Sequence, residues 1–142
     1  MAEETLVREA LSKEMIESGW ELARALRQRQ VEIAACFWLY SSDKNDWKLT
    51  LALPQVETDG PLKAYEAVQS VIRPLGPQQT EPERFRRLLR LTDVSVLEPS
   101  HQLVRSIQTV PLLNEDGMQF KESRLGDSFV EGVYIYNLSK LA

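Results

Sequence analysis

Residues 31–54 constrain the fold most narrowly, because two segments there carry apolar side chains at every second position. Such alternation is typical of β-strands, in which successive side chains point to opposite faces. A polar stretch over residues 41–46 separates the segments, and its Ser, Asp and Asn residues favour a turn. The sequence therefore predicts a β-hairpin. Its alternating residues are Val31, Ile33, Ala35, Phe37 and Leu39 in the first strand and Trp47, Leu49, Leu51 and Leu53 in the second.

The first strand of this hairpin is also apolar on its second face. That face carries Ala34, Cys36, Trp38 and Tyr40. A sheet that is apolar on both sides needs cover on both sides, either from helices of the same chain or from a partner. We expect the first face to be the main core face, and the cover over the second face is the open question.

Further elements follow from apolar spacing and from capping and turn residues. Helices are predicted over residues 3–29, over 61–74 after Asp59-Gly60, around Phe85 and Leu88 after the Pro-rich loop 74–82, and over 103–107 after Pro99-Ser100. Strands are predicted over 91–97, 119–125 and 129–138, with Gly126-Asp127 turning the last pair. Ser12 and Gly19 are the points at which the first helix could divide.

This order of elements predicts an α+β fold with a mixed sheet of about five strands, made of two hairpins and one further strand. Helices are expected to pack mainly on one face of the sheet. We expect one domain over residues 1–142, because a chain of this length can bury a core of its own.

Composition argues against several classes of protein. Hydrophobic residues make up 43% and charged residues 27% of the chain, and no apolar run approaches the ~18 residues of a membrane span. The chain starts with acidic residues where a secretory signal is basic, so we expect a cytoplasmic location. A net charge of -4 disfavours a dedicated nucleic-acid binder, since such proteins gain affinity by neutralising phosphates.

One cysteine and one histidine are too few for an internal disulfide or a structural zinc site. Cys36 has no adjacent cation or helix start that would lower its pKa, so we interpret it as a small buried hydrophobe. His101 falls in the first turn of a predicted helix, where a solvated side chain is the ordinary outcome. Phosphate-binding and metal motifs are absent from the sequence, and we assign no catalytic residue, metal ligand or cofactor.

The strongest charge feature is a cluster of four arginines, Arg84, Arg86, Arg87 and Arg90. In a helix Arg86 and Arg90 share a face, while Phe85 turns inward. Such a cluster could bind phosphates or carboxylates. The simpler interpretation is a solvated helix face paired with neighbouring acids.

Two aromatic pairs stand two positions apart in predicted strands, Trp38 with Tyr40 and Tyr134 with Tyr136, so each pair shares a face. Gly132 leaves room beside the second pair. If these strands are neighbours, the four rings form one platform. Three roles stay open for it: burial under a helix of the same chain, a subunit interface, or a stacking surface for a ligand such as an RNA base.

Three functional hypotheses follow. The first is association, most simply as a homodimer that uses Trp38, Tyr40, Tyr134 and Tyr136, with an unknown protein as the other candidate partner. The second is binding of nucleic acid or another polyanion through the arginine cluster. The third is an enzyme of unrecognised type, which lacks the support of paired catalytic groups at any telling spacing.

Overall fold

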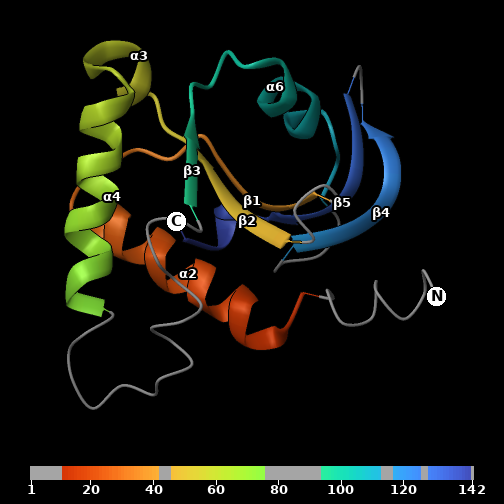
Figure 1. Ribbon diagram of the computed structural model, residues 1–142, viewed down its shortest axis with the longest axis horizontal. Helices are drawn as coiled ribbons and strands as arrows, with labels where there is room; N and C mark the ends of the chain where they lie inside the picture. The colour runs from red at the N-terminus through yellow and green to blue at the C-terminus, as the bar shows by residue number, and fades with distance from the viewer. Residues whose placement is uncertain (1–10, 42–45, 76–93, 113–116, 126–127, 142) are drawn as a thin grey trace.

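The structure, a computed structural model, describes residues 11–41, 46–75, 94–112, 117–125 and 128–141 (Figure 1). These residues form an α+β fold, as predicted. In chain order the elements are α2 (Lys13–Gln28), β1 (Ala35–Ser41), β2 (Asp46–Ala52), α3 (Gln55–Asp59), α4 (Pro61–Leu75), β3 (Val94–Leu97), α6 (Gln102–Gln108), β4 (Gly117–Leu125), β5 (Ser128–Tyr136) and the 3-10 helix η2 (Leu138–Leu141).

The five strands form one mixed sheet in the order β3-β2-β1-β5-β4. Both predicted hairpins are confirmed, because β1 pairs antiparallel with β2, and β4 with β5. The hairpins join through an antiparallel pairing of β1 with β5, whereas β3 adds to β2 in parallel. A parallel neighbour requires a crossover connection. Here α3 and α4 lie in that connection, between β2 and β3.

Helices pack on both faces of the sheet, with the two long ones on the same side. Figure 1 shows α2 and α6 on opposite sides of the strands. The larger apolar cluster includes Trp20, Leu22 and Leu26 of α2 together with Ala64, Val68 and Val71 of α4. The smaller cluster includes Val104 and Ile107 of α6. The two long helices thus cover one face of the sheet, and the short α6 lies on the other. This agrees with the expectation that helices pack mainly on one face.

The prediction of which face forms the main core is wrong. Cys36, Trp38 and Tyr40 belong to the larger cluster, under the two long helices. Phe37 belongs to the smaller cluster, with Leu39 partly buried beside it. The physical reason is the amount of apolar surface on offer, because the face with large aromatic rings gains most from burial under long amphipathic helices.

The predicted first strand begins too early, since β1 starts at Ala35. Gln30 adopts a left-handed φ of 65°, and the Val31 N–H donates to Leu26 O at 2.9 Å. This is a helix-ending turn of the kind usually made with glycine. It ties Val31 to the end of α2. Val31 and Ile33 therefore pack with the larger cluster instead of extending the face of Phe37.

The first helix also begins later than its apolar spacing suggests. Ser12 caps α2, and its Oγ accepts from the Met15 N–H at 3.1 Å. Such a side-chain bond satisfies one of the free N–H groups at a helix start. Residues 3–10 of the predicted helix lie outside the described part of the chain. Gly19 does not divide α2, which continues unbroken past it.

An unpredicted short helix, α3, precedes α4, and α4 protects the edge of the sheet. The Val96 N–H donates to the Tyr65 hydroxyl at 3.1 Å. The next residue, Leu97, points its carbonyl toward β2, where it accepts from the Leu53 N–H. Backbone groups of successive residues in a strand point to opposite sides, so the Val96 N–H points to the outer edge of the sheet. Tyr65 thereby occupies a donor that an exposed edge strand would offer to another chain.

The remaining predicted elements agree with the structure where it describes them, except that the strand predicted over 129–138 ends at Tyr136 and Leu138 begins η2. The predicted strand over 91–97 appears as β3, the predicted helix near 103–107 as α6, and the predicted end of α4 near Pro74 as an end at Leu75. The short helix around Phe85 and Leu88 lies outside the described residues. So does the loop from residue 76 onward.

Candidate functional site

The four aromatic residues predicted to form a platform do come together, because β1 and β5 are neighbours and Trp38 pairs with Tyr134. All four are buried within this chain: Trp38 is 1% exposed, Tyr40 7%, Tyr134 9% and Tyr136 2%. They lie in the cluster beneath α2. Of the three roles left open by the sequence, this placement matches burial under a helix. A partner could reach these rings only by displacing α2.

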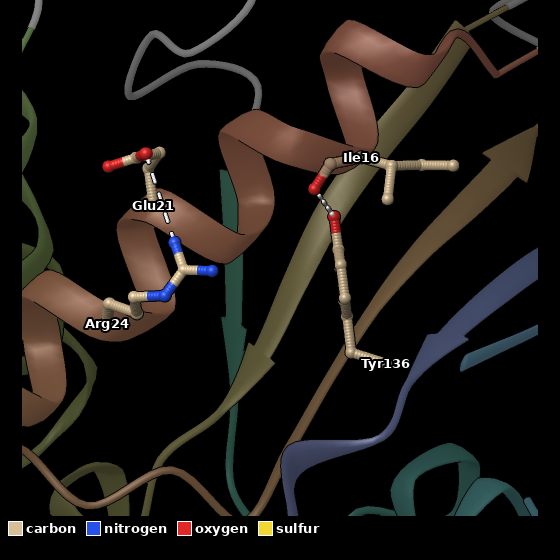
Figure 2. A network of polar contacts seen from close by, with 4 residues as sticks. All are labelled: Ile16, Glu21, Arg24 and Tyr136. Carbon is tan, nitrogen blue, oxygen red and sulfur yellow. Dashed lines mark hydrogen bonds and ion pairs between the residues drawn. The ribbon is translucent and has the colours of Figure 1, made fainter. Parts of the chain in front are cut away.

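Tyr136 connects the sheet to α2 through its hydroxyl. The Tyr136 hydroxyl donates to Ile16 O at 2.6 Å and accepts from Trp38 Nε1–H at 2.9 Å. Figure 2 shows the phenol pointing directly at the Ile16 carbonyl on the underside of the helix. Its ring also meets Trp20 edge-on, with ring centroids 4.8 Å apart. The Tyr136 ring thus fixes the position of α2 over β1 and β5.

Gly19 allows this close approach of helix and ring. A Cβ atom at position 19 would lie 2.0 Å from Tyr136 Oη and 2.7 Å from its Cζ. Both are closer than non-bonded atoms can stand, so a glycine is required at this point of α2. The ion pair of Glu21 with Arg24 lies farther along the same helix, at 3.9 Å and on half-exposed side chains (Figure 2). Such exposed pairs contribute little to stability.

Gly132 has a similar role in the sheet. A Cβ there would lie 3.2 Å from Trp47 Cη2 and 3.3 Å from Tyr40 Cβ. The indole of Trp47 packs against Tyr40, with ring centroids 5.3 Å apart, and extends over β1 toward β5. The space that Gly132 leaves is therefore filled by the ring of Trp47.

Cys36 is a small buried hydrophobe, as the sequence predicts, whereas His101 is a helix cap and not the solvated side chain expected from the sequence. Cys36 is fully buried, and this burial raises the pKa of its thiol. Nδ1 of His101 accepts from the Leu103 N–H at 3.1 Å, so the imidazole caps α6. Because the Cys36 thiol is buried and protonated, it is a poor nucleophile. Burial likewise raises the pKa of the Tyr136 phenol, with the nearby Cys36 thiol as a lesser cause.

We expect Cys36 to make folding stability depend on pH in the alkaline range. The thiol stays protonated in the folded chain but ionises in the unfolded chain near its ordinary pKa of 9.0. Stability from this group is therefore complete below pH 9.0 and is lost as the pH rises. The loss is about 1.4 kcal/mol per pH unit while the folded thiol stays neutral. Urea unfolding at a series of pH values, compared with Cys36→Ala, should show a steeper decline for the wild type.

The predicted polyanion-binding cluster, Arg84, Arg86, Arg87 and Arg90, lies outside the described residues. The structure therefore places none of these four side chains. In the described part of the chain, no group of three or more His, Cys, Asp or Glu residues could hold a metal ion. Within the same residues, no helix is both long and apolar enough to cross a membrane.

Over the residues that the structure describes, two large hydrophobic side chains are exposed, and sequence reasoning identified neither. Leu62, at the start of α4, is 71% exposed, and Phe129, in the β4–β5 hairpin, is 62% exposed. Phe129 stands opposite Arg124 in the strand register. Glu131 follows two residues later and is also exposed. The closeness of Phe129 to Arg124 and Glu131 was the available signal, because a large apolar ring exposed beside charged residues is unusual.

Exposed side chains of β4 and β5 around Phe129 form a surface that we name the outer hairpin surface. It comprises Lys121, Glu122, Arg124, Phe129 and Glu131. The regular alternation of side chains breaks nearby. Val130 and Val133 both belong to the smaller cluster, although residues three positions apart in a regular strand lie on opposite faces. Glu122 has a φ of 24° at the same level of the hairpin. This irregularity lets the end of the hairpin bury Val130 under α6 while Phe129 faces outward.

An open hollow and a smaller crevice lie beside the sheet. The hollow, of about 400 Å³, lies next to the end of α2 and is lined by Arg27, Gln30, Val31, Glu32 and Ile33. The smaller crevice, which we name the edge crevice, has a volume of about 190 Å³. Its walls include Ala34, Ala35, Ile107, Val110, Ile135 and Leu138. The edge crevice therefore lies beside the end of α6, where β1 begins and β5 ends.

Comparison with known proteins adds no relative to this description. The chain matches no protein-family model, no curated protein and no solved structure.

Proposed function

We propose that this protein acts by association, as a homodimer that forms through the outer hairpin surface. The observation that carries the proposal is the 62% exposure of Phe129 among charged neighbours. Aromatic residues surrounded by a polar rim are typical of the centre of protein interfaces. The aromatic residues first considered for such a contact are buried in the core, so the hairpin takes their place in the proposal.

The charges of the outer hairpin surface suit contact with a second copy of itself. Lys121 and Arg124 are positive, and Glu122 and Glu131 are negative, so the surface has no net charge. In a two-fold contact each residue meets a residue of the same patch. A two-fold axis near Phe129 can therefore bring Arg124 of one subunit to Glu131 of the other. The surface carries one exposed aromatic ring among four charged side chains, so we expect a weak, reversible dimer.

Sedimentation equilibrium from low to high micromolar concentration tests this proposal. We expect a wild-type average mass that rises toward that of a dimer. Phe129→Asp should keep the chain monomeric, because it places a charge at the centre of the contact. Leu62→Asp is the matched control, since it introduces the same charge at a leucine of α4 that is also largely exposed. It should associate like the wild type.

A charge exchange makes the test specific for the two-fold arrangement. Arg124→Glu should weaken association, and the further change Glu131→Arg should restore it. Exposed substitutions of this kind seldom alter stability by more than about 0.5 kcal/mol, and thermal melts will check this. A wild type that stays monomeric at high micromolar concentration contradicts the proposal. So does a Phe129→Asp variant that dimerises as well as the wild type.

A further inference from the structure

The edge crevice is small, apolar and partly enclosed. Its volume of about 190 Å³ exceeds the roughly 150 Å³ of an apolar cavity that holds benzene. It remains below the roughly 300 Å³ at which sites for drug-sized ligands begin. The space therefore suits a molecule of one or two aromatic rings.

The chemistry of the walls restricts the ligand further. Among the described residues that line the edge crevice there is no Asp, Glu, Lys, Arg or His. The Tyr136 hydroxyl is occupied by Ile16 O and Trp38 Nε1–H, and the Cys36 side chain is fully buried. A charged ligand would lose its hydration there without gaining an ionic partner. The lining therefore selects a neutral ligand.

Two features of the chain create the opening. Ala34, just before β1, and Ala35, its first residue, line the edge crevice with small side chains, so a larger residue at Ala34 would reduce its volume. At the rim, Gln108 Nε2 donates to Ala34 O at 3.2 Å, which ties the end of α6 to this segment. This bond fixes one wall of the edge crevice and orients the Gln108 amide at its mouth.

From this combination of volume, apolar lining and fixed rim, we infer that the edge crevice binds a small, neutral aromatic molecule of one or two rings. The ligand would lie against Val110, Leu112 and Leu138, the partly buried side chains of the wall. This site is separate from the outer hairpin surface and does not depend on dimer formation.

Indole is the probe for this inference, with titration of the full chain followed by NMR. We expect saturable binding and nuclear Overhauser contacts from indole protons to the methyl groups of Val110, Leu112 and Leu138. Indole-3-acetate carries the same rings with a negative charge and should bind at least ten-fold more weakly. Contacts to methyl groups elsewhere in the chain, or shifts that never saturate, would overturn the inference.

A pair of alanine substitutions supplies the matched comparison. Ala34→Leu fills the edge crevice and should weaken indole binding at least ten-fold. Ala67→Leu makes the same change at a half-buried position of α4, outside the residues that line the crevice, and should bind like the wild type. Equal affinity of the two variants would reject this site. If Ala34→Leu fails to fold, the methyl contacts in the wild type decide the question alone.

Discussion

Gly19→Ala will destabilise the folded protein by about 3 kcal/mol, whereas Gly to Ala inside a helix ordinarily stabilises by up to about 1 kcal/mol. The sign reverses because the new Cβ would lie 2.0 Å from Tyr136 Oη. The ring cannot retreat easily, since Trp20 and Tyr134 contact it with centroid distances of 4.8 and 5.2 Å. Either α2 lifts from the sheet or the two hydrogen bonds of the hydroxyl break. Urea unfolding followed by circular dichroism measures the change.

The control for this prediction removes the Tyr136 ring, which the new Cβ would otherwise meet. In a Tyr136→Leu background the shorter side chain does not reach position 19, so Gly19→Ala should become neutral or stabilising. A Gly19→Ala protein as stable as the wild type would show that the helix and the ring are not in the contact described.

Tyr136→Phe should cost about 2 kcal/mol, the second large effect. The change removes one oxygen but leaves the Trp38 Nε1–H, 2.9 Å away in the wild type, without its acceptor in the core. An unsatisfied buried donor costs roughly 1–3 kcal/mol. The same substitution deletes the bond to Ile16 O at 2.6 Å. We therefore expect lower stability together with faster hydrogen exchange of the Trp38 indole N–H, which NMR resolves.

A double-mutant cycle separates the hydrogen bond from packing. Trp38→Phe removes the donor as well as part of a buried ring. If the hydroxyl and the indole interact as described, Trp38→Phe should cost less in the Tyr136→Phe background than in the wild type. Strictly additive effects of the two substitutions would exclude an interaction between them.

The elements that the sequence could predict are those with a strong period or a distinct turn. The alternation of Trp47, Leu49 and Leu51 defines β2, and the spacing of Leu22 and Leu26 places α2 against a core. Polar residues 41–46 and Gly126-Asp127 located the connections of both hairpins. Local pattern was sufficient here because each of these features is decided within a few residues of the chain.

What the sequence could not predict depends on contacts between distant residues. Gln30 ends α2 in a conformation usually adopted by glycine, so Val31 and Ile33 were assigned to the strand. Which face of the sheet forms the main core depends on the side that the long helices cover. The alternation of apolar residues along a strand does not indicate that side. The exposure of Phe129 and the space beside Ala34 arise only once β5 and α6 are in place.

The position of β1 between β2 and β5 has a consequence for the order of folding. β1 can pair with β2 as soon as both leave the ribosome, but its other edge must wait for β5, about a hundred residues later: Trp38 pairs with Tyr134. Such distant pairings slow folding and leave apolar strand edges exposed to other chains in the meantime. Nascent chains that stop before Ser128 should therefore engage chaperones, and release from them should coincide with the synthesis of β5.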